Sequence, residues 1–392
     1  MTSSQRSNGN TRRGPLSDLR VIEFAGMGPG TFAGMILADL GAEVIRLEKP
    51  GNTSIVDTPI EFDLLNRGKK SLSINLKETG GREVALELVS KADLVIEGYR
   101  PGVMERLGLG PAECFSKNKK LIYGRMTGWG QDGPLSQRAG HDIAYIAITG
   151  ALHGIGPADG PPEIPLNLVG DFGGGGTFLA IGLLAALREA DKTGLGQVVE
   201  SAIIDGVAVL MTVIHGMFAA GQWQDKRGVN IIDGGAPYYA IYETKDGRHM
   251  VVGSIEPAFY TALMTGLGLD PDLARQNYQP DWPKLKAEIA STFAAQTMSY
   301  WVEKFAGTDA CVAPVLSMTE APAHPQIAHR ETFTEIEGVT QAMPAPRFSN
   351  HAQLISQGLP PRVGQHTQEI LANWGIADID GLIKAGIVQL EN

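Results

Sequence analysis

Cysteine is scarce in this sequence, and its scarcity excludes two kinds of small scaffold. The 392 residues include only Cys114 and Cys311, which lie far apart and form no Cys-x-x-Cys pattern. Neither a disulfide framework nor a cysteine-bound zinc ion is therefore indicated. Apart from His141, the histidines also show no metal-ligand spacing, so we expect no metal site. A reducing, cytoplasmic environment fits this composition best.

Basic residues and long hydrophobic runs are in short supply as well. Lys and Arg number 33 against 43 Asp and Glu, which gives a formal charge of −10 and disfavours nucleic acid or an anionic membrane as the main partner. The apolar segment Phe178–Leu187 is too short to span a bilayer, and Ile203–Ala220 is interrupted by Asp205 and His215. We therefore expect a soluble protein with no membrane partner.

The N-terminal residues 1–13 lack the apolar core of a secretory signal. Met1–Arg13 is rich in Ser, Asn, Thr and Arg and is interpreted as a disordered leader. The chain as a whole is 43% hydrophobic and 19% charged, and its length suffices for roughly two or three globular domains.

Strand and helix patterns alternate through the first half of the chain. Arg20–Phe24 is a predicted strand, and the glycine turn Ala25–Gly30, the helix Thr31–Leu40 and the strand Glu43–Leu47 follow it. Further strands are predicted at 71–76, 93–99, 121–126 and 197–201, with helices at 81–91, 101–107, 111–117, 142–149, 171–190 and 203–220. This alternation predicts a parallel sheet with helices on both faces.

The pattern changes in the second half. Residues 239–243 and 249–252 predict a β-hairpin around Lys245-Asp246-Gly247, and 256–307 predicts mainly helix. We therefore expect a smaller α+β domain here. From Met343 the chain is predicted to be extended, with closing helices at 366–374 and 379–385.

Two glycine-rich stretches are candidates for ligand binding. Gly28–Ala33 matches the G-x-G-x-x-A dinucleotide fingerprint, with Glu48 as a possible ribose partner, so an NAD-dependent dehydrogenase is one hypothesis. Pro29 removes an amide that would face a pyrophosphate, and tight packing of helix on strand is the competing interpretation. The run Gly173–Gly176 at a helix start suggests that something approaches the backbone closely.

His141 and Asp142 form a candidate proton-transfer stretch at a predicted loop-to-helix junction. Histidine titrates near neutrality, but Asp142 also has an ordinary role as a cap for the first-turn amides. Asp171 and Glu256 have similar capping interpretations, and Tyr145 lies on the same helical face as His141, where packing is the alternative to ligand contact.

Basic residues gather at predicted strand ends in the first half, where an open α/β sheet binds its ligands. Solvated surface charge is the alternative, but on an acidic protein the group suggests a site for a phosphorylated ligand. The residues are Arg46, Lys49, Arg67, Lys69, Lys70, Lys77, Arg100 and Arg106.

Several segments together resemble a known family, from about Pro15 to Pro346. They are Leu16–Glu23, Asp39–Ile45, Ile96–Val103, Gly140–Tyr145, Gly170–Gly175, Asp233–Tyr239 and Asp309–Val315. The sequence resembles the family III CoA-transferases and, within them, the α-methylacyl-CoA racemases. Gly140-His141-Asp142 and Ile255-Glu256-Pro257 are the racemase-like features.

The resemblance implies an α/β fold with a Rossmann-like large domain and a smaller α+β domain, joined by two linkers in an interlocked homodimer. The resemblance also implies that the protein binds no nicotinamide and needs no cofactor, since CoA is part of the substrate. The implied division is a leader at 1–14, a large CoA-binding domain at 15–220, a linker at 221–235, a small domain at 236–330, and a return linker with C-terminal helices at 331–392.

The resemblance also implies residue roles in the epimerisation of 2-methylacyl-CoA. His141 and Asp171 are the acid/base pair, Glu256 orients His141, and Asp142 offers its backbone amide to the enolate oxygen. The implied CoA contacts are Lys49, Ile74, Asn75, Leu76, Lys77, Gly98, Tyr99, Arg100, Arg106, Gly140 and Tyr145. The alternatives are a CoA-transferase with Asp171 as covalent nucleophile, and a noncatalytic CoA-thioester-binding protein.

Overall fold

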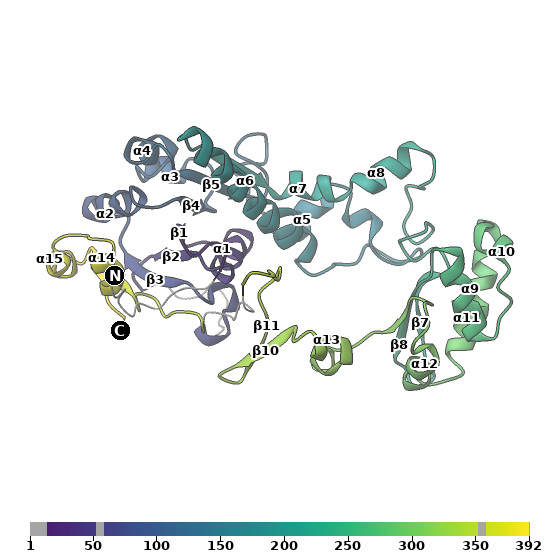
Figure 1. Ribbon diagram of the computed structural model, residues 1–392. Coiled ribbons are helices and arrows are strands. Elements are labelled where there is room, and N and C mark those ends of the chain that lie inside the picture. Colours follow the sequence, from purple (N-terminus) through teal and green to yellow (C-terminus); the bar gives the residue numbers. More distant parts are fainter. Residues whose placement is uncertain (1–13, 52–58, 352–357, 392) are drawn as a thin grey trace. The chain divides into compact units, whose positions relative to one another are not determined.

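The computed structural model describes residues 14–51, 59–351 and 358–391. Of the predicted leader 1–14, only Gly14 lies among the described residues. The chain divides into two compact units (Figure 1): the first comprises Met1–Ile146, Asn167–Leu210 and His329–Asn392, and the second comprises Ala147–Leu166 and Met211–Ala328. The first unit thus ends its middle segment at Leu210 rather than at residue 220, and residues 147–166 belong to the second unit.

The first unit is built on a mixed sheet whose order is β12-β3-β2-β1-β4-β5-β6 in the described part of the chain. Its strands are β1 (Arg20–Phe24), β2 (Glu43–Glu48), β3 (Lys70–Ile74), β4 (Leu94–Glu97), β5 (Ile122–Thr127), β6 (Val198–Ala202) and β12 (Val388–Gln389). The central strand β1 pairs in parallel with both neighbours, Val21 lying opposite Val44 and Leu94. The predicted parallel sheet is confirmed, and the strand order reverses between β1 and β4, as in doubly wound folds.

Helices flank this sheet, and most of them lie where the sequence predicts. They are α1 (Pro29–Asp39), α2 (Thr79–Val89), α3 (Val103–Arg106), α4 (Pro111–Lys117), α5 (Asp142–Ile148), the π-helix η4 (Leu168–Thr177), α6 (Phe178–Thr193), α7 (Ile203–Leu210), α14 (Thr367–Asn373) and α15 (Ile379–Lys384), with 3₁₀ turns at Ile60–Phe62 and Leu64–Asn66. Ile370, Leu371 and Trp374 of the C-terminal segment are buried in the same apolar core as Ile22 and Leu72.

The strand β12 was not predicted. Its Val388 pairs antiparallel with Ile74 at the edge of the sheet. A two-residue strand carries too little periodicity to be recognised in a sequence, and only its pairing with β3 defines it. The hairpin of β10 (Phe333–Ile336) and β11 (Val339–Ala342), which the sequence left in a return linker, is a second addition.

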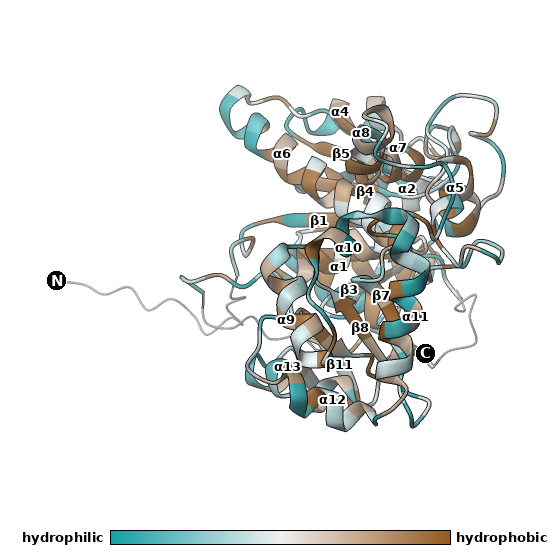
Figure 2. Cartoon of the chain, turned by 90° about the vertical axis from the view of Figure 1, so that its right-hand side faces the viewer, coloured by the Kyte–Doolittle hydropathy of each residue, from teal (hydrophilic) through white to brown (hydrophobic). Residues whose placement is uncertain are grey.

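The π-helix η4 continues directly into α6, so that Leu168–Thr193 forms one helix of 26 residues. The helix predicted at 171–190 is therefore confirmed, with Gly173–Gly176 inside it, and it is three residues longer at each end. The apolar run Phe178–Leu187, which is too short on its own to span a bilayer, is only part of this longer helix. Length and composition alone would allow a membrane span, but a core helix passes the same test. Leu179 and Leu183 are fully buried, and much of α6 and the strands β4 and β5 are coloured hydrophobic in Figure 2.

The second unit contains a three-stranded antiparallel sheet and a group of helices. The strands are β7 (Tyr239–Glu243), β8 (His249–Gly253) and β9 (Val312–Pro314); the helices are α8 (Thr212–Ala219), α9 (Pro257–Leu267), α10 (Leu273–Asn277), α11 (Trp282–Phe293), α12 (Met298–Phe305) and α13 (Pro325–His329), with 3₁₀ turns at Leu152–Gly154, Gln279–Asp281 and Ala321–Ala323. The predicted hairpin is confirmed by the pairing of β7 with β8. The single helix predicted at 203–220 is two helices, α7 and α8, separated at Met211.

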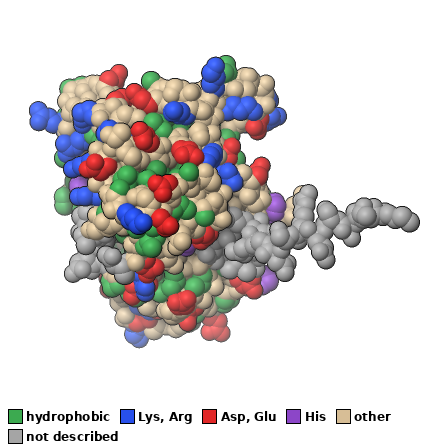
Figure 3. Space-filling model, turned by 90° about the vertical axis from the view of Figure 1, so that its left-hand side faces the viewer, with side chains coloured by type: hydrophobic (Ala, Val, Ile, Leu, Met, Phe, Trp, Pro, Cys, Tyr) green, Lys and Arg blue, Asp and Glu red, His purple; other side chains and the backbone are tan. Residues whose placement is uncertain are grey.

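One face of the molecule carries side chains of both charges. On the face drawn in Figure 3, acidic and basic side chains are interspersed among hydrophobic and uncharged ones over the described residues. No broad field of one sign covers the described residues of this face.

Candidate functional site

A cavity of about 540 Å³ lies at the carboxyl edge of the large sheet. Gly28 follows β1, Gly98 follows β4 and Thr127 ends β5, so the cavity opens where the strand order reverses. This is the position at which open α/β sheets bind their ligands. The lining residues are Met27, Gly28, Pro29, Leu65, Gly98, Met126, Thr127, Gly128, Gly140, His141, Tyr145, Asn167, Asp171, Phe172 and Ile203.

The structure places His141 and Asp171 in the lining of one cavity, although they lie 30 positions apart in the sequence. His141 is exposed just before α5, and Asp171 lies in the π-helix η4. Burial raises the pKa of the Asp171 carboxyl; a hydrogen bond from Asn167 opposes this rise, the charge of Asp142 adds to it and His141 opposes it. A carboxyl group with a raised pKa beside a histidine is suited to proton transfer.

Asn167 is a site residue that the sequence analysis missed. Its Nδ2 donates to Asp171 Oδ2 over 3.4 Å, and both side chains line the cavity. The signal available in the sequence was their spacing of four residues, which places them on one face of a helix.

The Asp142 side chain does not cap its own helix in the way that was predicted. Its Oδ2 accepts a hydrogen bond of 2.7 Å from the backbone N–H of Asp171, at the start of a different helix. Asp142 is only 6% exposed, and Gly170 lies so close that a Cβ there would be 2.4 Å from Oδ2. A residue larger than glycine at position 170 would therefore displace the carboxylate.

Tyr145 is both a packing residue and a cavity residue. Its ring lies edge-on to Trp129 with centroids 4.6 Å apart, and it fills space beside Gly128 and Gly140, where a Cβ would clash with it. Burial raises the pKa of the Tyr145 hydroxyl, the negative charge of Asp171 adds to the rise, and Arg100 opposes it. The two interpretations offered for this residue are thus compatible.

The glycine run 173–176 serves helix packing. A Cβ at Gly175 would lie 2.9 Å from Pro29 Cβ, and one at Gly176 would lie 2.6 Å from the Pro29 carbonyl oxygen. Gly174 approaches the backbone of Val207 in α7 in the same way. Neighbouring helices make the close approach that the sequence indicated.

The dinucleotide hypothesis is not supported by the residues that it needs. Glu48, the proposed ribose partner, is buried and accepts hydrogen bonds from Arg46 and Ser71. Gly28 does begin α1 with a φ of +66°, but it faces the Asp171 carboxyl, whose charge would repel a pyrophosphate. The fingerprint here belongs to the fold.

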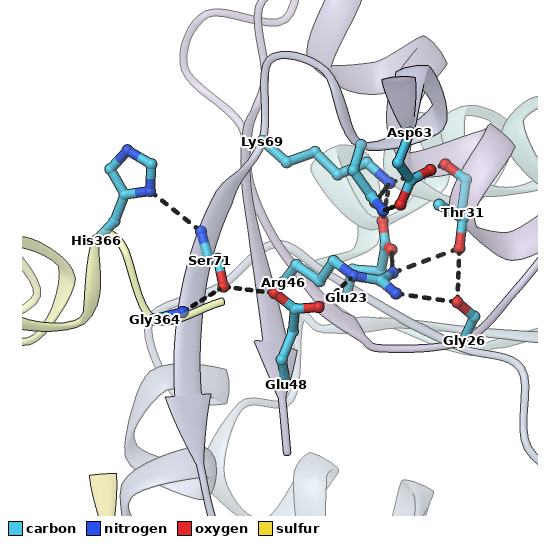
Figure 4. A network of polar contacts seen from close by, with 11 residues as sticks. Glu23, Gly26, Thr31, Arg46, Glu48, Asp63, Lys69, Ser71, Gly364 and His366 are labelled. Atoms are coloured by element: carbon cyan, nitrogen blue, oxygen red, sulfur yellow. Dashed lines mark hydrogen bonds and ion pairs between the residues drawn. The ribbon is translucent and has the colours of Figure 1, made fainter. Parts of the chain in front are cut away.

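Three of the basic residues assigned to a phosphate site are instead buried in ion pairs. Arg46 lies between Glu23 and Glu48 (Figure 4). Arg67 pairs with Asp39 at 2.6 Å, and Lys69 Nζ lies 2.7 Å from Glu23. Burial lowers the pKa of Lys69 to about 8, and the charge of Glu23 opposes the decrease. These three residues hold the core together and are not available to a ligand.

Of the other basic residues, Lys70 pairs with Glu43 and Glu369. Four remain exposed at or near the carboxyl edge of the sheet, where the prediction placed a phosphate site: Lys49, Lys77, Arg100 and Arg106. Among the described residues, no group of three or more His, Cys, Asp and Glu side chains could hold a metal ion.

The other residues predicted to contact CoA differ in their burial and in their hydrogen bonds. Ile74 is fully buried opposite Val388, and the Asn75 N–H donates to the Ile387 carbonyl, so both help to dock the C-terminal strand. Leu76 is half-buried, while the Tyr99 N–H donates to the Glu97 carboxylate. Of the predicted site residues, those that line the cavity are Gly98, Gly140, His141, Tyr145 and Asp171.

Glu256 belongs to the second unit and is exposed. It is the N-cap residue of α9, followed by Pro257 at the first helical position, but its side chain accepts no capping hydrogen bond. Glu256 therefore lies at the N-cap, one residue before the first turn in which the sequence analysis placed it as an ordinary acidic residue.

Comparisons with known proteins identify the family of this chain. A family model described as CoA-transferase family III matches residues 16–367. The alpha-methylacyl-CoA racemase of Mus musculus is 43% identical over 92% of this chain and 94% of its own length, and that of Homo sapiens is 41% identical over the same shares. A solved CAIB/BAIF family protein from Brucella suis has a TM-score of 0.79 at 26% identity and covers 93% of this chain and 100% of its own. The chain belongs to CoA-transferase family III.

Proposed function

We propose that this protein interconverts the (R) and (S) forms of 2-methylacyl-CoA thioesters by removing and returning the α-proton. The observation that carries the proposal is the presence of His141 and Asp171 in one cavity at the carboxyl edge of the sheet. The mouse and human relatives that are named for this activity support it.

The chemistry requires two proton carriers. A base removes the α-proton, the electron pair of the C–H bond enters the thioester carbonyl as an enolate, and an acid delivers a proton to the opposite face of the carbon. His141 and Asp171 take these two roles and exchange them for the other enantiomer. The α-carbon lies between them, and the net change is inversion with no cofactor consumed.

The raised pKa of the Asp171 carboxyl suits it to act both as a base and as an acid. Burial raises its pKa, which makes it a stronger base than an exposed carboxylate and lets it keep a proton at a higher pH. A positioned acid or base contributes about 10²–10⁴-fold to the rate of such a step. In this proposal the backbone amide of Asp142 donates to the enolate oxygen.

The CoA moiety needs cations for its phosphates. Lys49, Lys77 and Arg100 are exposed after the carboxyl ends of β2, β3 and β4, and they supply this charge in the proposal, together with Arg106. We further propose, from the family resemblance, a cytoplasmic homodimer of Rossmann-like and small domains in which Glu256 hydrogen-bonds His141 and orients its ring.

The test is α-proton exchange in deuterated water. Wild-type protein is incubated with each enantiomer of a panel of 2-methylacyl-CoA thioesters, and deuterium incorporation and epimer ratio are measured by mass spectrometry and chiral separation. We expect exchange with convergence on both epimers, and a loss of roughly 10²–10⁴-fold in H141A and D171N. His153→Ala is the matched control, because His153 is exposed and does not line the cavity.

A CoA-transferase reaction is the alternative that the family description keeps open. It would transfer CoA to a free carboxylic acid through a covalent anhydride at Asp171, which hydroxylamine would trap. Trapping at Asp171 without α-exchange would replace the racemase proposal with this one. Retained binding without either reaction would indicate a noncatalytic CoA-thioester-binding protein.

A further inference from the structure

The carboxylate of Asp142 connects the two segments that carry the proposed acid/base pair. Asp142 follows His141 directly in the chain, and its Oδ2 accepts the backbone N–H of Asp171 over 2.7 Å. One side of this contact is therefore covalently attached to His141, and the other is the main chain of Asp171. A single hydrogen bond therefore links the residue next to His141 with the main chain of Asp171.

The surroundings make this contact specific. The Asp142 side chain is 6% exposed, and Gly170 leaves the space that its Oδ2 occupies, since a Cβ at residue 170 would lie 2.4 Å away. The same Cβ would lie 3.1 Å from Ile146 in α5. The η4 backbone at Gly170 therefore lies directly against the Asp142 and Ile146 side chains of α5, next to the amide that the carboxylate binds.

We propose that the Asp142 side chain is a positioning group that sets the geometry of His141 relative to Asp171, in addition to any role of its backbone. This inference rests on the proposed racemase function. It assigns the residue a second task that a plain helix cap would not have, because the amide that it binds belongs to Asp171 itself.

The charge of Asp142 gives the contact an electrical consequence. Its Oδ1 is buried and has no hydrogen-bond partner among the described residues. The charge of Asp142 adds to the effect of burial in raising the pKa of the Asp171 carboxyl, while Asn167 lowers it. Asp142 and Asn167 thus act on Asp171 in opposite directions.

Two substitutions at Asp142 separate position from charge. In Asp142→Asn an amide oxygen can still accept the Asp171 N–H, but the charge is absent; in Asp142→Ala the acceptor is lost as well. We expect Asp142→Ala to lower kcat by about 10²-fold with a smaller change in KM, because misplacement on the scale of 1 Å has this effect. We expect Asp142→Asn to keep a kcat much closer to that of the wild type than Asp142→Ala does.

The pH profile of α-exchange provides the readout that a merely structural role would not change. With the enantiomer for which Asp171 is the base, the acidic limb of kcat/KM reports this carboxyl. We expect Asp142→Asn to move the limb to lower pH and Asn167→Ala to move it to higher pH. An unchanged limb in Asp142→Asn, or full activity in Asp142→Ala, would overturn the inference.

A measurement without substrate keeps this test independent of the reaction. Hydrogen–deuterium exchange of the peptide around Asp171 is expected to accelerate in Asp142→Ala and in Gly170→Ala, and to stay near wild type in Asp142→Asn. If the wild-type protein shows no α-exchange, the proposed function fails while the contact is still tested. If it does show exchange but Asp142→Ala keeps full activity, only the positioning role fails.

Discussion

Gly28 lies directly against the carboxylate of Asp171: a Cβ on residue 28 would be 3.4 Å from Oδ2. The glycine that the sequence offered as part of a dinucleotide fingerprint is thus a wall of the proposed racemase site. Its φ of +66° also belongs to a region that other residues rarely adopt.

Gly28→Ala is expected to cost about 1–3 kcal/mol of stability through backbone strain. Because its methyl group would touch the Asp171 carboxylate and take up space in the cavity, it is also expected to lower the rate of α-exchange. Gly133→Ala is the control, because Gly133 also has a positive φ, of +86°, but a Cβ there meets no atom within 4 Å. We expect both variants to lose stability in urea unfolding, but only Gly28→Ala to lose kcat. A similar kcat in both variants would contradict the assignment.

Glu97, at the carboxyl end of β4, is expected to make stability depend on pH. Burial raises its pKa to about 7, although the Tyr99 N–H and Arg125 oppose the increase. The folded state therefore binds this proton more tightly than the unfolded state does, and the free energy of unfolding falls as pH rises from about 4.5 to about 7.

Glu97→Gln removes this titration and keeps an oxygen that accepts the Tyr99 N–H. We expect it to raise the free energy of unfolding by roughly 1–3 kcal/mol at pH 8 and to change it little at pH 5, measured by urea titration at both values. Equal effects at the two pH values would show that Glu97 does not titrate between them.

Ser71 is expected to hold the C-terminal segment onto the sheet. Its Oγ accepts the Gly364 N–H over 2.9 Å and donates to Glu48, and its own N–H donates to His366 Nδ1 (Figure 4). Ser71→Ala leaves two buried groups without this partner and is expected to cost about 1–3 kcal/mol in chemical unfolding. Ser116→Ala, at an exposed serine that binds only a local carbonyl, should change stability by far less.

The contact of α7 with η4 is expected to reject even a methyl group. A Cβ on Gly206 would lie 1.8 Å from the Gly174 carbonyl oxygen, so Gly206→Ala should destabilise the protein despite the higher helix propensity of alanine. Gly216 in α8 has open space at the same position. Gly216→Ala should therefore stabilise the protein by about 0.5–1 kcal/mol. We expect thermal unfolding to show a lower melting temperature for Gly206→Ala and a higher one for Gly216→Ala.

Sequence reasoning was accurate where the information is local. The strand Arg20–Phe24 was predicted residue for residue, and the hairpin around Asp246 was found from its turn and alternation. The basic residues show the limit of this reasoning. Arg46 and Lys69 resemble free cations in the sequence, because the Glu23 that neutralises both lies 23 residues before Arg46 on another strand.

The catalytic candidates divide in the same way. Sequence alone determined the α/β alternation, the segments His141-Asp142 and Asp171, and the family to which they point, because hydrophobic period and residue identity are properties of neighbours in the chain. Only the tertiary structure decided that Asp142 binds the Asp171 amide, that Gly28 lies beside the Asp171 carboxyl, and that the glycine run serves helix packing. These contacts join residues far apart in sequence, and strand order and close packing of backbones create them; no local pattern encodes either.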